Sequence, residues 1–316
     1  MVGAADVAVQ ELTPDLLRLR IGFVNVYLAG FPAREASISP WALVDAGLAM
    51  GAATILDVAA KRFGVDARPA AIVLTHGHFD HVGALEALLG VWDVPVYAHT
   101  AEFPFLTGHA DYPPPDPTVG GVVLARLSPA APEAGIDLGD RLRALPDNKD
   151  VPGMPGWRWI PTPGHSPGHV SLFRAADRAL IAGDAVATAR QESLYAAFVE
   201  RKALTGPPAY FTIDWDKAER SATTLASLKP ALIAAGHGEP MTHPSVAEDL
   251  AALARDFTHR GRPSHGRYAH HPALTDEEGV VALPAPSHAG RARWGALSGV
   301  AAATFAGTWL YRRFGR

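Results

Sequence analysis

The segment Thr75-His76-Gly77-His78-Phe79-Asp80-His81 places three histidines and an aspartate within six positions. Imidazole nitrogens and carboxylate oxygens are the ligands that Zn²⁺ binds at roughly 2.0–2.2 Å. His76 and His78 are two residues apart, so in extended backbone their side chains project to the same side. Asp80 and His81 fall where the chain turns into a predicted helix. The spacing therefore indicates two pairs of ligands and a second metal beside the first, rather than a polar loop that happens to be rich in histidine.

The residues around this segment predict the elements that position it. Residues 70–74 form a short apolar run that is typical of a buried strand. The ligands then lie at the C-terminal end of the strand, where open α/β sheets usually bind their ligands. Residues 82–89 carry apolar side chains at helical spacing, and Gly90 supplies a C-terminal stop.

Three further candidate ligands follow short apolar strands in the same way. Strands are predicted at 157–160, 179–182 and 231–235, and they lead to His165, Asp184 and His237 respectively. Glycine flanks each of these ligands, and glycine allows tight turns and a close approach of the backbone. Four such junctions in one chain point to a single site.

The motifs THGHFDH, PGHSPGH, GD and GHG, in this order, resemble the metallo-β-lactamase fold superfamily of hydrolases, over about residues 9–259. The nearest branch is the one of glyoxalase II and the lactonases, which has a bridging aspartate. The resemblance implies an α/β protein, a four-layer αββα sandwich with the metals at one edge between its two sheets. It also implies a first zinc on His76, His78 and His165, a second zinc on Asp80, His81 and His237, and Asp184 as the bridge.

The chemistry implied by the resemblance is hydrolysis by two zinc ions. A hydroxide shared by the metals would attack an ester, thioester or lactone carbonyl, since Zn²⁺ lowers the pKa of bound water towards neutrality. Asp80 lies next to this nucleophile and is the candidate to carry a proton to the leaving group. A pure ligand role for Asp80 stays open. Iron or manganese is an alternative to zinc, because His/Asp sites accept several divalent metals.

Departures from the family pattern narrow the substrate. The chain has no cysteine, and it has a Gly-Asp bridging ligand, so the true β-lactamases are disfavoured. Residues 185–193 do not match the basic and aromatic residues that glutathione-thioester hydrolases show after the bridging aspartate. Two alternatives remain: a phosphodiesterase that uses the same metals, and a mononuclear iron persulfide dioxygenase on an overlapping ligand set.

Length and composition agree with a soluble enzyme, and we expect its substrate to be a small molecule. The net charge is −4 and the pI is near 6.4, so no basic field would recruit nucleic acid. The first residues lack a secretory pattern and the chain lacks cysteine, which favours a cytoplasmic protein. The oligomeric state is open.

Several other residues are candidates for supporting roles. A strand is predicted at 41–46, and Asp45 near its end is a candidate partner of the metal ligands, though a weaker candidate than the ligands themselves. His169 either orients a ligand or packs at the start of the strand 170–173, and packing is slightly favoured. The Pro-rich loop 103–132 is predicted to roof the site. The aromatic residues Tyr195, Tyr210 and Phe211 either line a substrate pocket or belong to the core.

The sequence predicts a catalytic domain over residues 1–262 and a Pro/Gly/Ala-rich extension over 263–316. Further strands are predicted at 7–12, 16–21 and 24–28, and helices at 215–228 and 245–259, the second capped by Ser245. Residues 294–311 carry no charge and are flanked by arginines, which suggests a helix. Membrane association through this segment is one interpretation. Its low content of Leu and Ile favours a helix packed on protein or a mobile tail.

Overall fold

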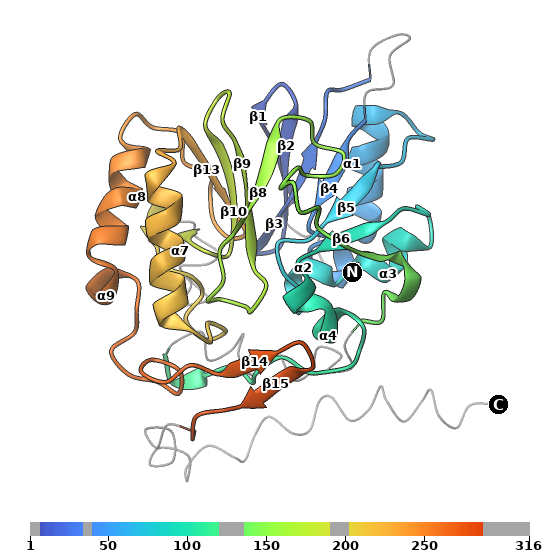
Figure 1. The fold of residues 1–316 in the computed structure, drawn as a ribbon. Helices are drawn as coiled ribbons and strands as arrows, with labels where there is room; N and C mark the ends of the chain where they lie inside the picture. Colours follow the sequence, from blue (N-terminus) through green and yellow to red (C-terminus); the bar gives the residue numbers. More distant parts are fainter. Residues whose placement is uncertain (1–6, 34–39, 120–135, 190–201, 287–316) are drawn as a thin grey trace, which may run out of the picture. The chain divides into compact units, whose positions relative to one another are not determined.

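Two β-sheets lie face to face between two layers of helices (Figure 1). The computed structural model describes residues 7–33, 40–119, 136–189 and 202–286. The first sheet has the strand order β1 (Val7–Thr13), β2 (Leu16–Ile21), β3 (Val24–Ala29), β4 (Ala42–Val44), β5 (Ala71–Val73), β6 (Val96–Ala98) and β7 (Leu142–Ala144). The second has the order β13 (Leu232–Ala235), β10 (Ala179–Gly183), β9 (Val170–Arg174) and β8 (Trp157–Pro161).

Strand direction changes within the first sheet. Strands β1 to β4 pair in antiparallel fashion, whereas β4 to β7 pair in parallel. Parallel neighbours need long crossover connections, which here include the helices α1 (Ala52–Phe63), α2 (Phe79–Val82) and α3 (Leu85–Leu89). The parallel arrangement brings the C-terminal ends of β4 and β5 to the same edge, and the ligand-bearing segment begins at that edge.

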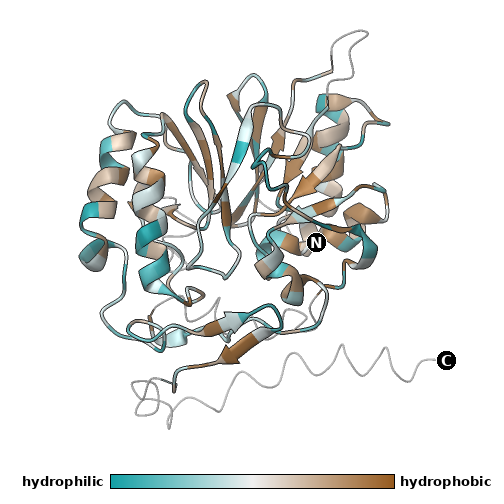
Figure 2. Cartoon of the chain, in the orientation of Figure 1, coloured by the Kyte–Doolittle hydropathy of each residue, from teal (hydrophilic) through white to brown (hydrophobic). Residues whose placement is uncertain are grey.

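Three buried clusters fill the three interfaces of the sandwich. Alternate residues of one strand enter different clusters, as the two-residue period of a strand requires. Leu43 and Ile72 pack with the helices α1 and α3, while Val44 and Val73 face the second sheet. A third cluster joins the second sheet to α7 (Trp215–Ser227) and α8 (Val246–Arg255). The strands are accordingly apolar, and the outer helices carry both hydrophobic and hydrophilic residues (Figure 2). The predicted αββα sandwich is confirmed.

Smaller elements complete the described chain. Besides short 3₁₀ turns, they are α4 (Phe103–Leu106), α9 (Phe257–Arg260), and the two-stranded sheets of β11 (Ala187–Ala189) with β12 (Lys202–Thr205) and of β14 (Leu274–Asp276) with β15 (Gly279–Ala282).

The helices differ in three places from the sequence prediction. The helix expected over 82–89 is two short helices, α2 and α3, separated at Gly83, where a Cβ atom would lie 2.6 Å from the backbone nitrogen of Ala49. The helix expected over 245–259 is divided into α8 and α9. Ser245 does precede α8, but its hydroxyl pairs with the His243 ring and caps no backbone N–H, so the capping prediction was wrong. Helix α1 was not predicted.

The compact unit that contains the sandwich continues to Pro284, beyond the boundary predicted at residue 262. The Tyr268 hydroxyl donates a hydrogen bond to the carbonyl of Pro114, and the Arg267 backbone N–H donates to the Asp116 carboxylate. These two long-range hydrogen bonds attach residues 263–284 to the loop that contains Pro114 and Asp116. The predicted helix over 294–311 lies outside the described residues. No helix within the described ranges is both long and apolar enough to cross a bilayer.

Candidate metal centre

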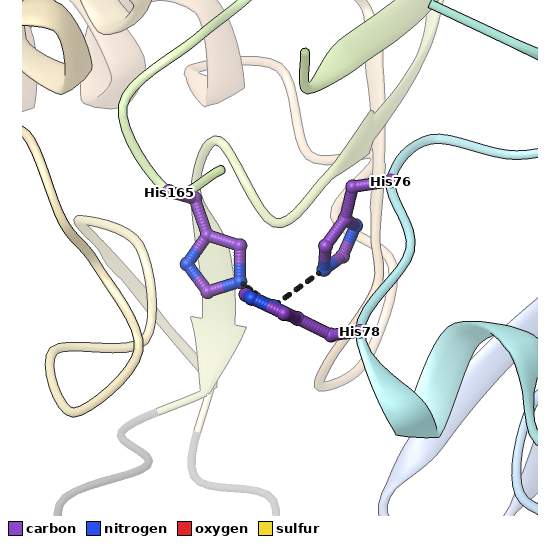
Figure 3. Close-up of side chains that lie close together, drawn as sticks. All are labelled: His76, His78 and His165. Atoms are coloured by element: carbon purple, nitrogen blue, oxygen red, sulfur yellow. Dashed lines mark hydrogen bonds between the residues drawn. The ribbon is translucent and has the colours of Figure 1, made fainter. Parts of the chain in front are cut away.

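Three histidine rings converge at the edge between the two sheets (Figure 3). The Nδ1 atom of His78 lies 3.0 Å from Nε2 of His76 and 3.0 Å from Nε2 of His165. His76 and His78 follow β5, and His165 follows β8. Burial lowers the pKa of His78 to about 3 and holds the pKa values of His76 and His165 well below the usual range. The three rings are therefore neutral, with their nitrogens aimed at one point.

A second group adjoins the first. Its members are Asp80, His81 and His237, and the carboxylate of Asp184 lies between the two groups. Oδ2 of Asp184 is 3.1 Å from Nε2 of His237, 3.6 Å from Nε2 of His81 and 3.4 Å from Nε2 of His165. Oδ2 of Asp80 is 3.4 Å from Nε2 of His237. The structure thus brings together all seven residues that the sequence analysis named.

Charge in this second group is strongly coupled. Burial opposes a charge on Asp184, but the His237 and His81 rings hold the pKa of its carboxyl well below the usual range. In return, Asp184 raises the pKa values of His81 and His237 against the effect of burial. The carboxylates therefore favour positive charge in this part of the cluster, which a bound cation would supply in place of the ring protons.

Hydrogen bonds on the far side of four rings direct their metal-facing nitrogens. Nδ1 of His81 lies 2.8 Å from the Asp45 carboxylate, and Nδ1 of His237 lies 2.9 Å from the Phe23 carbonyl oxygen. Both partners only accept hydrogen bonds, so Nδ1 donates in each ring. In the neutral rings, the form that binds a metal, the Nε2 atoms of His81 and His237 therefore point their lone pairs into the cluster.

The same arrangement holds for the other two rings, through threonine hydroxyls. Nδ1 of His76 lies 3.1 Å from Oγ1 of Thr75, which donates its own hydrogen to Asp45. Nδ1 of His165 lies 3.1 Å from Oγ1 of Thr212, which donates its hydrogen to the Pro208 carbonyl. Each hydroxyl must therefore accept from the ring.

Two of the inward-facing atoms test whether the donor set fits a metal. Nε2 of His81 and Oδ1 of Asp184 are buried and lack a hydrogen-bond partner among the described residues. Buried polar atoms in native structures nearly always have partners. Five imidazoles and two carboxylates at the edge of two sheets are a donor set that fits Zn²⁺ and other divalent transition metals. We therefore assign this cluster as metal-binding.

Glycines beside the ligands leave room for them. A Cβ atom on Gly236 would lie 2.1 Å from Oδ1 of Asp184, and one on Gly183 would lie 2.6 Å from Nε2 of His169. Gly183 also has a φ of 53°, which favours glycine. The flanking glycines seen in the sequence are thus needed at these two positions for close approach.

Two residues with uncertain roles in the sequence support the ligands directly. Asp45 is buried beside the cluster and accepts hydrogen bonds from both Thr75 and His81. Nε2 of His169 accepts a hydrogen bond of 2.9 Å from the Asp184 backbone N–H. Burial lowers the pKa of His169 to about 4, which keeps its ring neutral and able to accept. His169 therefore positions the backbone of Asp184 in addition to packing at the start of β9.

Sequence reasoning missed the residues that hold the loop around His237. The Asn25 side-chain amide donates to the carbonyls of Ala235 and Gly238, at 2.9 and 2.8 Å. The buried Arg18 guanidinium donates to Asn25 and to the Gly238 carbonyl. Both residues are polar but lie within fully buried strands, β2 and β3, and that contrast is the signal by which they could have been found.

A pocket of about 1250 Å³ adjoins the cluster at His78. The rings of Tyr112 and Phe211 lie on His78, with centroids at 4.6 and 4.9 Å. The described part of the Pro-rich loop, up to residue 119, supplies Phe105 and residues 110–115 to the pocket wall, which confirms the roof prediction for that part. Phe211 lines the pocket, whereas Tyr210 is buried against Phe211. Tyr195 lies outside the described residues.

Comparison with known proteins agrees with this geometry. The family model described as "Metallo-beta-lactamase superfamily" matches residues 20–237. The chain belongs to the metallo-β-lactamase superfamily. Within it, the probable metallo-hydrolase YflN of Bacillus subtilis (strain 168) is 45% identical over 236 residues, which cover 75% of this chain and 88% of the relative. This metallo-β-lactamase superfamily member is a metal-dependent hydrolase.

Two further comparisons support the same superfamily and fold. The probable metallo-hydrolase YybB of Bacillus subtilis (strain 168) is 30% identical over 175 residues, which cover 55% of this chain and 67% of the relative. The crystal structure of a beta-lactamase domain protein from Burkholderia ambifaria aligns with a TM-score of 0.56 at 21% identity, over 81% of this chain and 77% of the other. At that identity the likeness concerns the fold alone.

Proposed function

We propose that this metallo-hydrolase binds two zinc ions and cleaves an ester, thioester or lactone carbonyl. One observation carries the proposal: Oδ2 of Asp184 lies between the His76–His78–His165 group and the group that contains His81 and His237. A carboxylate in that place can bridge two metals. His76, His78 and His165 would hold one ion, and Asp80, His81 and His237 the other.

Bound there, two divalent ions supply a Lewis acid for the carbonyl and an acidified water. The ligands contribute only the two negative charges of Asp80 and Asp184 against the charge of two divalent cations. The loaded site would therefore keep a net positive charge, and positive charge in a site sheltered from water favours the oxyanion that develops when a carbonyl is attacked. Histidines that coordinate a metal do so as neutral imidazoles, so they would leave that positive charge uncompensated.

We assign to Asp80 the transfer of a proton to the leaving group. This residue lies in the first turn of α2 and belongs to the second group, with Oδ2 3.4 Å from Nε2 of His237. Burial raises the pKa of its carboxyl in the metal-free protein. A carboxylate held beside the reacting centre in this way can take a proton and pass it to the leaving group.

The adjoining pocket supports a carbonyl substrate that has an apolar arm. Its described lining is mostly apolar and aromatic, with Phe105, Leu138 and Phe211 among the residues, and it meets the cluster at His78. Acyl or alkyl groups are the parts of esters, thioesters and lactones that such a wall would bind.

The test combines metal content with a panel of substrates. Protein purified without added metal should contain about two zinc ions per chain by mass spectrometry. It should hydrolyse p-nitrophenyl acetate, a thioester or a lactone in preference to bis-p-nitrophenyl phosphate. Asp184→Asn should lose both metal and activity, while Asp66→Asn, at an exposed position, should lose neither. About one iron per chain with oxygen uptake on a persulfide, or cleavage of the phosphodiester alone, would overturn the proposal.

A further inference from the structure

Glu102 is a fully buried carboxylate outside the ligand set. It ends the short 3₁₀ turn η2 (Thr100–Glu102) after β6. Oε1 accepts hydrogen bonds from the Ser166 hydroxyl at 2.7 Å and from the Gly168 N–H at 2.6 Å. Oε2 accepts from the Gly77 N–H at 3.0 Å and from the Tyr112 hydroxyl. A charge so deeply buried is costly unless it is fully hydrogen-bonded, and here four donors meet it.

Three of these four donors, Gly77, Ser166 and Gly168, belong to the two loops that carry one metal position. Gly77 lies between His76 and His78, and Ser166 directly follows His165. The carboxylate of Glu102 therefore joins the loop that carries His76 and His78 to the loop that carries His165.

The other ligands are held by other residues. His81 is bonded to Asp45, His237 to the Phe23 carbonyl, and the Asp184 backbone to His169. Glu102 makes none of these bonds. Asp45 links the two positions, because it bonds to His81 and, through the Thr75 hydroxyl, to His76.

Tyr112 contacts both Glu102 and the His78 ring. Its hydroxyl accepts a hydrogen bond from the Gly77 N–H at 3.0 Å and donates to Glu102. Its ring lies 4.6 Å from the His78 ring and stacks on Phe105 at 4.1 Å. His78 is fixed through its neighbouring backbone and also through its ring face.

We propose that Glu102, assisted by Tyr112, is a positioning residue that sets the metal affinity of the His76–His78–His165 position and leaves the other position unaffected. This inference rests on the proposed function in one respect, namely that the cluster binds two metals. It assigns no contact between Glu102 and the substrate.

The test is Glu102→Gln, which keeps the side-chain shape but turns one acceptor into a donor that faces N–H and O–H donors. Residues that orient metal ligands typically change affinity 10- to 100-fold when they are replaced. We expect a loss of about that size at the trio position, measured by Zn²⁺ titration of the metal-free full-length chain against a chromophoric chelator. Tyr112→Phe should lose less, and the exposed Glu248→Gln should match wild type.

Two backgrounds assign the effect to one position. In His237→Ala, which retains the trio position, adding Glu102→Gln should weaken Zn²⁺ binding about 10-fold or more. In His165→Ala, which retains the other position, it should change binding by less than about twofold. Circular dichroism checks folding, and Ser166→Ala, which removes one donor to Glu102, replaces Glu102→Gln if that variant unfolds.

The outcomes separate this inference from the proposed function. Equal losses in both backgrounds, or no loss in His237→Ala, would overturn the positioning role of Glu102. Wild-type protein that binds about one Zn²⁺ or none would instead overturn the dinuclear proposal, whatever the behaviour of Glu102→Gln.

Discussion

Asp45→Asn is the sharpest test of how the second metal position is built. Asp45 is 1% exposed, and its Oδ1 accepts the Thr75 backbone N–H at 2.8 Å. Its Oδ2 accepts the Thr75 hydroxyl and Nδ1 of His81, each at 2.8 Å. The residue has a φ of 59°, a backbone conformation that asparagine tolerates. The substitution therefore alters hydrogen bonding while it leaves volume and backbone unchanged.

The magnitude follows from the donors that would face an amide. In either orientation the Asn –NH₂ group points at one or two of the three donors, so one or two hydrogen bonds to a charged group are lost. Such bonds contribute about 1.5–3 kcal/mol each, so the free energy of unfolding should fall by about 1.5–6 kcal/mol. If the amide donates to Nδ1 of His81, the ring proton moves to Nε2, the atom that faces the cluster. Metal affinity should then fall by about 10- to 100-fold.

Urea unfolding of the metal-free protein measures the first effect, and Zn²⁺ titration against a chelator measures the second. Asp66→Asn is the control for loss of a carboxylate at an exposed position. A free energy of unfolding within about 0.5 kcal/mol of wild type, together with unchanged Zn²⁺ affinity, would refute the role given to Asp45.

Three other perturbations test the site. Because burial lowers the pKa of His169 to about 4 from 6.5, its neutral ring stabilises the fold fully above pH 6.5, and this stability is lost as the pH falls towards 4. His169→Gln should therefore flatten the pH dependence of metal-free unfolding in that window, by up to about 3 kcal/mol; an unchanged profile would contradict this. Gly236→Ala should displace Asp184, since the new Cβ would lie 2.1 Å from Oδ1, and metal content by mass spectrometry should drop while circular dichroism stays native. Removing metal with a chelator should lower the melting temperature, and re-adding Zn²⁺ should restore it in proportion to the logarithm of its concentration; a melting temperature indifferent to Zn²⁺ would count against a site formed only in the folded state.

Local sequence was sufficient to predict that the seven candidate ligands lie together. His76, His165, Asp184 and His237 each follow a short apolar run, and those runs are the strands β5, β8, β10 and β13. An apolar run bounded by glycine specifies a buried strand, and strand ends in a sandwich meet at a common edge. The type and spacing of the residues therefore carried both the chemistry and its location.

The supporting residues could not be predicted in the same way. Glu102 ends a short turn after β6, where a charge is ordinarily solvated. Its burial arises because three loops distant in sequence meet there. The continuation of the compact unit beyond residue 262 could not be seen in the sequence for a similar reason. Residues 263–284 have a loop-like composition, but they are attached through contacts such as Tyr268 with Pro114, which no local pattern encodes.

The ligands come from both halves of the sandwich. His76 to His81 follow a strand of the first sheet, while His165, Asp184 and His237 follow strands of the second. Any ion held by His76 and His165 would therefore be a reversible cross-link between the two halves, at the edge where their apolar interface ends. Loading with metal would tighten that edge, so the strength with which the two halves are joined should rise with metal occupancy.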